Sequence, residues 1–316
     1  MADKTYYDLI ILGAGPAGMT AAVYAARKQM DMLVITENVG GQTTWSSDIE
    51  NYLGFRLITG PELVAKFEEH VNTFSIPREF TRVTGLTRPG PAFRVETEDG
   101  RSFAARAVIV ATGKSPRTLG VPGEKQFTGR GVTYCATCDG PLFAGKNVAV
   151  VGGGNSGLDA AIQLMKICPK VYIVEVEPRL RADQVMVSQA RAAGNVEILT
   201  GTSVSDILGD GFVNAVTVAT GGEARRLDVE GVFVEVGLIP NADFVGDVVR
   251  LNPVGEIPVD CAARTGIPGL YAAGDVTDVP EKQIIIAAGD GAKAALGAYS
   301  YLVRLPGSGD WARKTS

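Results

Sequence analysis

The sequence of 316 residues predicts an α/β protein with two Rossmann-like, three-layer nucleotide-binding units. Two observations support this prediction. A strand–glycine turn–helix–strand pattern occurs twice, and a third apolar strand near the C-terminus leads into a helix of small residues. The composition, 46% hydrophobic and 21% charged, is typical of a folded globular protein.

The first unit occupies residues 6–37 and reads YYDLIILGAGPAGMTAAVYAARKQMDMLVITE. An apolar strand runs into the G-x-G-x-x-G turn formed by Gly13, Gly15 and Gly18, and an apolar helix follows. Glycines let the backbone approach a pyrophosphate, and the helix N-terminus presents free N–H groups to it. The pattern therefore predicts a nucleotide site.

The second unit occupies residues 145–177 and reads GKNVAVVGGGNSGLDAAIQLMKICPKVYIVEVE. Its glycines are Gly152, Gly154 and Gly157, each 139 residues after its counterpart in the first unit. Apolar residues at helical spacing predict a helix that Pro169 stops, with Cys168 on its apolar side. Two copies in the right context are much stronger evidence than one.

Further apolar strands complete the pattern. AVIVATGKSPR at residues 107–117 resembles GVFVEVGLIPN at residues 231–241, and both read as buried strands that end in a glycine and a proline-containing turn. We expect them to close two related domains. RTGIPGLYAAGDV at residues 264–276 reads as a strand ending at Gly274 and Asp275, and a small-residue helix is expected from Gly289 to Leu302.

Charge and hydropathy exclude some function classes. The net charge is −5 without a long basic run, so we expect no nucleic-acid partner. Residues 9–26 carry no charge, but GAGPAG interrupts them, so we predict a strand, a turn and a buried helix rather than a membrane span. The N-terminus shows no secretory signal, and we expect a cytoplasmic protein.

The cysteines are Cys135, Cys138, Cys168 and Cys261. The first two have C-x-x-C spacing, which suits a reducible disulfide. A zinc site would need a second pair of ligands, and His70 is the only histidine, so we expect no metal. Asp139, directly after the pair, fits either a proton-holding role or a turn-forming one.

Together these motifs resemble the low-molecular-weight thioredoxin reductases, which are FAD-dependent. The matching segments are GAGPAG, VGGQTTWSSDIENYLGF, VIVATG, YCATCDG, VGGGNSG and GLYAAGDVTDVPEKQIIIAAGDGAKAAL, in this order. The resemblance implies an FAD domain of residues 1–116 plus 248–316, with an inserted NAD(P)-binding-like domain of residues 117–247 that carries the C-x-x-C pair. It also implies a homodimer and rotation between the domains during turnover.

The resemblance assigns residues to two sites. Those expected at FAD are Gly13, Gly15, Pro16, Ala17, Gly18, Glu37, Gly41, Gln42, Asn51, Ala111, Thr112, Gly113, Gly274, Asp275, Gln283 and Ile284. Among them, Glu37 is expected at the adenosine ribose, although it lies one place beyond the position that matches Glu175 in the second unit. Those expected at a possible second nucleotide are Gly152, Gly154, Asn155, Ser156, Glu175 and Arg181.

The implied activity is a thioredoxin-disulfide reductase. Electrons pass from a donor through FAD to the Cys135–Cys138 disulfide and then to thioredoxin. The resemblance makes Cys138 the sulfur nearer the flavin and Cys135 the one that attacks the partner's disulfide. Asp139 supplies or accepts a proton.

The sequence departs from the family at the residues expected to bind the electron donor. In NADPH-using members the second unit's last strand ends in an HRR motif, and Glu175, Val176 and Glu177 stand there instead. An acid at this strand end suits the free ribose 2′-OH of NADH. We therefore expect NADH. Reduced ferredoxin or another donor remains open, as does NADPH held by Arg179 and Arg181.

Three further alternatives concern the chain ends and the function class. The tail RLPGSGDWARKTS fits a disordered terminus, or a segment that places Trp311 on a flavin face where nicotinamide would bind. A flavin-containing redox sensor with little turnover is a different function class. The flavin component of a hydroperoxide reductase shares these motifs but adds an N-terminal domain. Because the first strand begins at Tyr6, we expect that domain to be absent and an external acceptor to be used.

Overall fold

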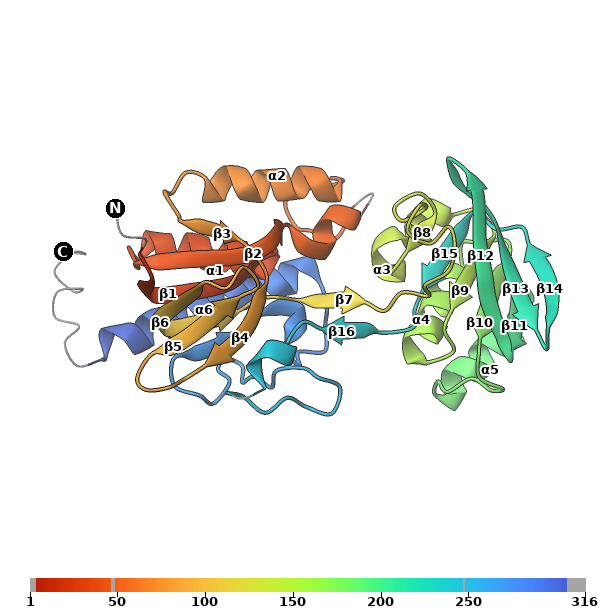
Figure 1. The fold of residues 1–316 in the computed structure, drawn as a ribbon. Helices are drawn as coiled ribbons and strands as arrows, with labels where there is room; N and C mark the ends of the chain where they lie inside the picture. The colour runs from red at the N-terminus through yellow and green to blue at the C-terminus, as the bar shows by residue number, and fades with distance from the viewer. Residues whose placement is uncertain (1–3, 47–48, 247, 306–316) are drawn as a thin grey trace.

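The computed structural model describes residues 4–46, 49–246 and 248–305. The chain forms two lobes joined by a narrow connection (Figure 1). The larger lobe contains the first and the last of the described residues, and the smaller lobe is built from the middle of the chain. Each lobe has a sheet of mainly parallel strands covered by helices, and the sheet of the large lobe also includes antiparallel pairs at one side. This confirms the predicted α/β fold with two Rossmann-like units.

The sheet of the large lobe has seven strands in the order β3-β2-β1-β6-β5-β4, with β17 also paired to β6. The strands are β1 (Tyr6–Ala14), β2 (Met32–Val39), β3 (Arg78–Phe80), β4 (Val83–Thr87), β5 (Phe93–Thr97), β6 (Ser102–Val110) and β17 (Leu270–Ala272). The central strand β1 lies between β2 and β6, parallel to both. Its residues Leu9–Leu12 are fully buried, as expected for a strand covered on both faces.

The helices of the large lobe are α1 (Pro16–Arg27), α2 (Gly60–Val71), α6 (Ile284–Val303) and the short 3-10 turns η1 (Gly41–Trp45), η3 (Asp243–Val245) and η4 (Gly274–Val276). Helix α6 packs along α1. It starts at Ile284, not at the predicted Gly289, because Gln283 is an extended N-cap whose carbonyl accepts the N–H of Ala287. The small residues from Gly289 onwards indicated only the part of α6 that packs closely against its neighbours.

The small lobe contains a parallel sheet in the order β11-β10-β9-β15-β8 and an antiparallel sheet, β12-β13-β14. Its strands are β8 (Val132–Thr133), β9 (Val148–Val151), β10 (Val171–Glu175), β11 (Val196–Thr200), β12 (Thr202–Asp210), β13 (Phe212–Thr220), β14 (Glu223–Leu227) and β15 (Gly231–Val234). Its helices are α3 (Ala136–Asp139), α4 (Asn155–Leu164), α5 (Gln184–Ala192) and η2 (Gly140–Phe143).

Helix α4 ends earlier than predicted. Its last residue is Leu164, and Cys168 lies beyond the end of the helix rather than on it. The N–H groups of Ile167 and Cys168 both donate to the carbonyl of Leu164, which closes a C-terminal turn before Pro169 is reached. Cys168 is nevertheless buried, as expected for a small apolar side chain.

Two short strands connect the lobes: β7 (Lys114–Pro116) and β16 (Leu238–Pro240). They pair antiparallel, with Ser115 opposite Ile239. These segments were predicted as proline-containing turns, and that prediction is wrong. Proline disfavours central strands, but in a two-stranded ribbon every strand is an edge strand, where proline is tolerated.

The chain returns to the large lobe directly after β16. Ala242 and Val245 are already buried in the same core cluster as Ile10 and Val108. The division into residues 1–116 plus 248–316 and residues 117–247 stays a prediction. The core packing favours a return point near residue 241.

Candidate active site

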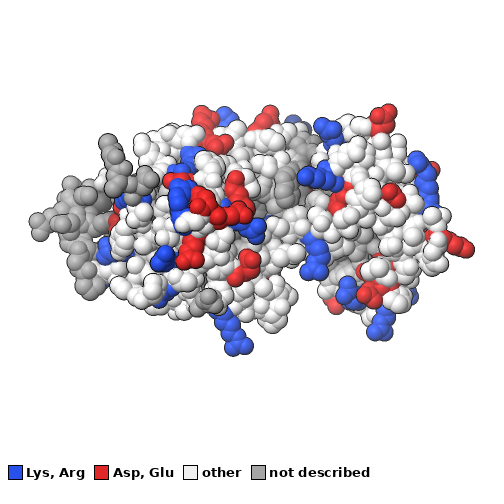
Figure 2. All heavy atoms as spheres, in the orientation of Figure 1, with Lys and Arg blue, Asp and Glu red and all other residues white. Residues whose placement is uncertain are grey.

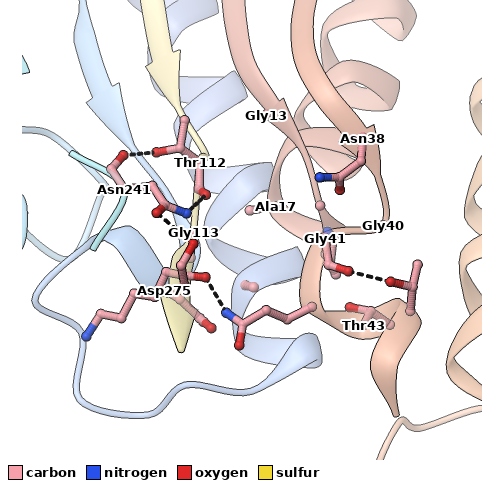
Figure 3. A pocket seen from close by; sticks show the side chains of 18 of the residues that line it. Gly13, Ala17, Asn38, Gly40, Gly41, Thr43, Thr112, Gly113, Asn241 and Asp275 are labelled. Carbon is pink, nitrogen blue, oxygen red and sulfur yellow. Dashed lines mark hydrogen bonds between the residues drawn. The ribbon is translucent and has the colours of Figure 1, made fainter. Parts of the chain in front are cut away.

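A cavity of about 730 Å³ lies where the two lobes meet. It is lined by Gly13, Gly15, Pro16, Ala17, Glu37, Gly41, Gln42, Asn51, Ala111, Thr112, Gly113, Gly274, Asp275, Gln283 and Ile284, and also by Cys135, Cys138 and Asp139. Of the residues expected at FAD, only Gly18 is not in the lining. Residues far apart in the sequence, among them Gly13, Gly41, Thr112 and Asp275, converge on it (Figure 3).

The first glycine turn has the shape that a pyrophosphate site requires. Gly13 has φ +103°, and a Cβ there would lie 2.4 Å from the Ala111 carbonyl oxygen. A Cβ on Gly18 would lie 1.9 Å from the Gly13 carbonyl oxygen, so Gly18 closes the turn from behind. A Cβ on Gly15 would meet nothing within 4 Å. The turn is therefore tightly packed inside and open towards the cavity, as the predicted FAD pyrophosphate needs.

The second glycine turn has the same geometry. Gly152 has φ +126°, and its Cβ would lie 2.4 Å from the Glu235 carbonyl oxygen. A Cβ on Gly157 would lie 1.9 Å from the Gly152 carbonyl oxygen, while Gly154 faces open space. The residues expected at the second nucleotide do not line the 730 Å³ cavity and form a separate region of the small lobe. The second turn thus keeps a shape that suits a nucleotide.

Glu175 ends strand β10 beneath this second turn. It is buried, and its carboxylate accepts the Gly153 N–H on Oε2 at 2.6 Å and the Glu177 N–H on Oε1 at 2.8 Å. Glu177 and Arg181 are exposed. The acid predicted at the ribose therefore also holds the backbone of the glycine turn in place.

The first unit uses a different residue at the matching position. There the Ala14 N–H donates to Thr36 Oγ1 at 3.2 Å, and Thr36 is buried. Glu37 follows it, with an exposed side chain that lines the cavity. Its assignment to the adenosine ribose stays a prediction, and Thr36 is the structural counterpart of Glu175.

Cys135 and Cys138 form a disulfide, as predicted, with their Cα atoms 5.3 Å apart. Cys135 is the N-cap of α3, and its Sγ accepts the Cys138 N–H at 3.2 Å. Asp139 is buried directly below the pair, and its Oδ2 accepts a hydrogen bond from the Thr133 hydroxyl. Asp139 thus places a buried carboxyl group at the wall of the cavity that the disulfide also lines, and its role in proton transfer stays a prediction.

The sequence interpretation missed the role of Asn241. The Thr112 hydroxyl donates to the Asn241 carbonyl at 2.6 Å, and Asn241 Nδ2 donates to the Thr112 carbonyl at 2.9 Å (Figure 3). These bonds hold the end of β16 against the predicted flavin site. The resemblance between residues 107–117 and 231–241 contained this residue but gave no sign of the contact.

A second missed feature is a group of charges at the cavity. Lys114 Nζ lies 2.6 Å from Glu256 Oε1, with both side chains nearly buried, and Lys282 Nζ lies 3.4 Å from the same oxygen. Burial is the largest cause that raises the pKa of Asp275, and the two lysines oppose it. Burial likewise lowers the pKa of Lys282. The site therefore combines partly buried charges of both signs.

Polar contacts also join the residues expected at the flavin side. Gln42 Nε2 donates to the Lys114 carbonyl at 2.6 Å. Asn51 Nδ2 donates to Gln283 Oε1 at 3.1 Å, which ties the loop after η1 to the start of α6. These side chains are thus held in place from several elements.

The remaining sequence predictions concern isolated residues. Cys168 Sγ donates to the Phe143 carbonyl at 3.2 Å, and burial raises the pKa of this thiol to about 11. Cys261 is exposed. Trp311 lies outside the described residues.

The remaining general properties of the described residues are the apolar character of their helices, the grouping of potential metal ligands and the surface charge. Across residues 4–46, 49–246 and 248–305, no helix combines the length and apolar character needed to cross a membrane. Within those ranges, no three His, Cys, Asp or Glu side chains gather into a group that could hold a metal ion. On the face shown in Figure 2, Lys and Arg are interspersed with Asp and Glu.

Comparison with known proteins identifies the family. The family model described as pyridine nucleotide-disulphide oxidoreductase matches residues 7–291. The chain is 44% identical to an alkyl hydroperoxide reductase component of Xanthomonas campestris pv. phaseoli, covering 96% of this chain and 58% of that protein. It is 42% identical to an NADH dehydrogenase of Bacillus subtilis, covering 96% and 60%. The chain thus spans less than two thirds of the length of these relatives.

Solved structures match over their full length. The thioredoxin reductase of Streptococcus pyogenes is 39% identical with a TM-score of 0.90, covering 96% of this chain and 100% of that one. The Lactococcus lactis thioredoxin reductase in its FR conformation is 37% identical with a TM-score of 0.67, covering 95% and 100%. The chain therefore belongs to the pyridine nucleotide-disulphide oxidoreductase family, as an oxidoreductase flavoprotein whose structural neighbours are thioredoxin reductases of the low-molecular-weight type.

Proposed function

We propose that the protein is a disulfide reductase that passes two electrons from NADH, through FAD and the Cys135–Cys138 disulfide, to thioredoxin or a similar disulfide protein. One observation carries the proposal. The disulfide lines the same cavity as the first glycine turn and the other residues expected at FAD. A two-electron carrier in that cavity would have the disulfide as its neighbour.

The cavity residues fit FAD. The turn at Gly13 and Gly15, with the N-terminus of α1, would hold the pyrophosphate, and Asp275 and Gln283 would hold the ribitol and ring region. When bound, FAD supplies a carrier that takes two electrons from a hydride donor and gives them to a disulfide. The Lys114–Glu256 ion pair and Lys282 supply fixed charges beside it.

The cysteine pair then performs thiol–disulfide exchange. Two electrons and two protons convert the Cys135–Cys138 bond into a Cys138 thiol and a Cys135 thiolate, with the second proton held on Asp139 until it passes to the partner's released thiolate. The Cys135 thiolate attacks a sulfur of the partner's disulfide, forming a mixed disulfide and releasing one partner thiolate. Cys138 then attacks Cys135, which restores the original disulfide and releases the partner as a dithiol.

This cycle requires the lobes to move. The disulfide faces the cavity, so a partner protein needs a second arrangement in which the cysteines reach the surface. The β7–β16 ribbon is a narrow connection about which the lobes can rotate. Relatives of nearly equal identity, 39% and 37%, have TM-scores of 0.90 and 0.67, which supports two arrangements of the same lobes.

NADH is the proposed donor. The second glycine turn has the shape of the first, and Glu175 and Glu177 oppose the 2′-phosphate of NADPH. The name of the Bacillus subtilis relative, NADH dehydrogenase, supports the same choice. We also propose a homodimer in the cytoplasm. Ferredoxin is the alternative donor, and a redox sensor with little turnover is the alternative class.

Replacing each cysteine in turn tests the relay. Cys135→Ser should abolish reduction of a thioredoxin disulfide by the FAD-loaded enzyme while flavin bleaching by NADH continues. Cys261→Ser, at an exposed cysteine outside the cavity, is the matched control and should retain full activity. Undiminished thioredoxin reduction by Cys135→Ser would refute the proposed relay. Slow turnover by the wild type with every disulfide acceptor would favour the sensor.

A further inference from the structure

Glu124 is a buried carboxylate that the proposed relay does not use. It lies in the segment between β7 and β8, and only 4% of its surface is exposed. Three donors point at it. The Leu119 N–H lies 2.9 Å and the Tyr134 hydroxyl 3.1 Å from Oε1, and the Gly120 N–H lies 2.8 Å from Oε2. Both oxygens are occupied by donors, so an acceptor-only carboxylate is the group that fits.

These hydrogen bonds join the interlobe linker to the residue just before Cys135. Leu119 and Gly120 follow strand β7 closely, so they mark the point where the linker enters the small lobe. Tyr134 directly precedes Cys135. Burial, with the nearby charge of Glu124, raises the pKa of Tyr134 to about 12, so its hydroxyl stays a donor at neutral pH.

Side-chain hydrogen bonds anchor the backbone before Cys135. Strand β8 contains only Val132 and Thr133, at the edge of its sheet, where it pairs with β15. The Thr133 hydroxyl donates to Asp139 and accepts the Cys135 N–H at 3.3 Å, which fixes this segment on one side. The bond from Tyr134 to Glu124 fixes it on the other. Tyr134 also lines the cavity beside the disulfide.

We propose that Glu124 and Tyr134 are a positioning pair for the thiol–disulfide relay, which sets the place of Cys135 against the cavity by tying the residue before it to the end of the interlobe linker. This role rests on the proposed function. Neither side chain exchanges electrons or forms a bond with the partner's sulfurs. The linker end and Cys135 both belong to the small lobe. When the lobes rotate about the ribbon, the same hydrogen bonds therefore keep the cysteines at a fixed position relative to the small lobe.

Two variants separate this role from simple stability. Tyr134→Phe keeps the ring and deletes the hydroxyl. Glu124→Gln keeps the size but turns an NH2 group towards a donor, so at least one of the three hydrogen bonds is lost. Tyr172→Phe is the matched control for the first, because Tyr172 packs on the same core cluster. Glu223→Gln, at an exposed residue of β14, is the control for the second.

The measurement is the reactivity of the two thiols in the FAD-loaded enzyme reduced with excess NADH or dithionite. Iodoacetamide labels Cys135 and Cys138, and mass spectrometry of the peptides gives the ratio of their rates from pH 6 to pH 9. We expect Tyr134→Phe to change this ratio severalfold, with an unchanged FAD content and a melting temperature lowered by only about 2–4 °C, the shift that loss of one hydrogen bond produces. The kcat for thioredoxin reduction should fall severalfold while the KM for the donor stays the same.

The outcomes distinguish a failure of the proposed function from a failure of the positioning role alone. A wild-type enzyme that gains no alkylatable thiols at positions 135 and 138 on reduction refutes the proposed function itself. A wild type that gains them, with Tyr134→Phe showing the wild-type ratio and kcat, refutes the positioning role alone. The role is supported when Tyr134→Phe and Glu124→Gln shift the ratio in the same direction and both controls match the wild type. If Glu124→Gln fails to fold, the tyrosine variant decides.

Discussion

The carboxylate of Glu175 accepts the backbone N–H of Gly153 at 2.6 Å, inside the second glycine turn. In the first unit, the matching N–H of Ala14 is accepted by the hydroxyl of Thr36. The two turns share one backbone shape but differ in the charge fixed beneath them. The second turn therefore carries a built-in anion close to where a nucleotide's ribose would lie, and the first does not.

Two glycines of the first turn should respond differently to a methyl group. Gly18→Ala places a Cβ 1.9 Å from the Gly13 carbonyl oxygen, so the backbone must shift, at a cost of about 1–3 kcal/mol or more in the free energy of unfolding. Gly15 has ordinary dihedral angles, φ −74° and ψ −176°, and open space around it. Gly15→Ala should therefore fold normally without FAD and bind it at least about tenfold more weakly, since ~1.4 kcal/mol is a factor of ten.

Thermal melting of the FAD-free proteins and fluorescence titration with FAD would measure the two effects. Gly90→Ala is the matched control, because a Cβ there also meets nothing within 4 Å and lies away from the cavity. Wild-type FAD affinity in Gly15→Ala would mean that the pyrophosphate does not approach this turn.

Cys168 should remain unreactive in the folded enzyme. Burial raises the pKa of its thiol to about 11, and the thiolate is the nucleophile, so iodoacetamide at pH 8 should not label it. Exposed Cys261 is the internal control and should be labelled in the same sample. Mass spectrometry of the two peptides gives the answer. Labelling of Cys168 at the rate of Cys261 would contradict the structure.

Glu235 should make the protein less stable as the pH rises. Burial is the main cause that raises the pKa of this carboxyl to about 7, and Asp159 adds to it, while the Ala136 amide opposes it. The folded state then holds a proton that the unfolded chain, with a pKa near 4.5, releases. The stabilising contribution is complete below pH ~4.5 and is lost as the pH rises through ~7.

The measurement is the melting temperature of the wild type and of Glu235→Gln between pH 5 and pH 8. The wild type should lose stability over this window relative to the variant, whose amide does not titrate. Glu230→Gln, at an exposed neighbour on the chain, should follow the wild type. Parallel pH curves for the wild type and Glu235→Gln would show that Glu235 is ionised throughout.

The sequence predicted those parts of the site whose geometry depends on local backbone shape. Gly13 and Gly152 need positive φ, and the C-x-x-C spacing places two sulfurs within bonding reach, so both motifs are visible in the chain itself. Asn241 was missed because its contact with Thr112 joins residues 129 positions apart. That contact exists only because β7 and β16 run side by side.

The same limit explains the linker and the buried acid at position 124. Prolines 116 and 240 indicated turns, because nothing local shows that the two segments pair with each other. Glu124 carries no sequence signal, since its three donors are backbone and hydroxyl groups brought to it by the fold. Tertiary packing determines which charged side chains become buried and which donors surround them. The sequence alone shows only which residue types are present.

The donor preference should be controlled by Glu177 as well as Glu175. A 2′-phosphate ~6 Å from each carboxylate is opposed by roughly 1–5 kcal/mol for an effective dielectric of ~80 to ~20, and exposure of Glu177 places it at the low end. We therefore expect NADH to bleach the flavin faster than NADPH under anaerobic conditions. Ferredoxin, added after photoreduction, is tested in the same experiment.

Substitutions at the two acids should have different consequences. Glu175→Ala removes the acceptor of the Gly153 and Glu177 N–H groups, so it should weaken both NADH binding and the fold, by about 1–3 kcal/mol for the buried Gly153 N–H that is left unsatisfied. Glu177→Arg leaves those bonds intact and adds a cation, so it should shift the preference towards NADPH, while Glu177→Gln should give a smaller shift. Stopped-flow flavin absorbance would measure all three. Rapid bleaching of the wild-type flavin by NADPH at micromolar concentration would contradict the proposed repulsion between the two glutamates and the 2′-phosphate. Bleaching by ferredoxin alone would mean that the second glycine turn keeps its shape but does not bind a nicotinamide.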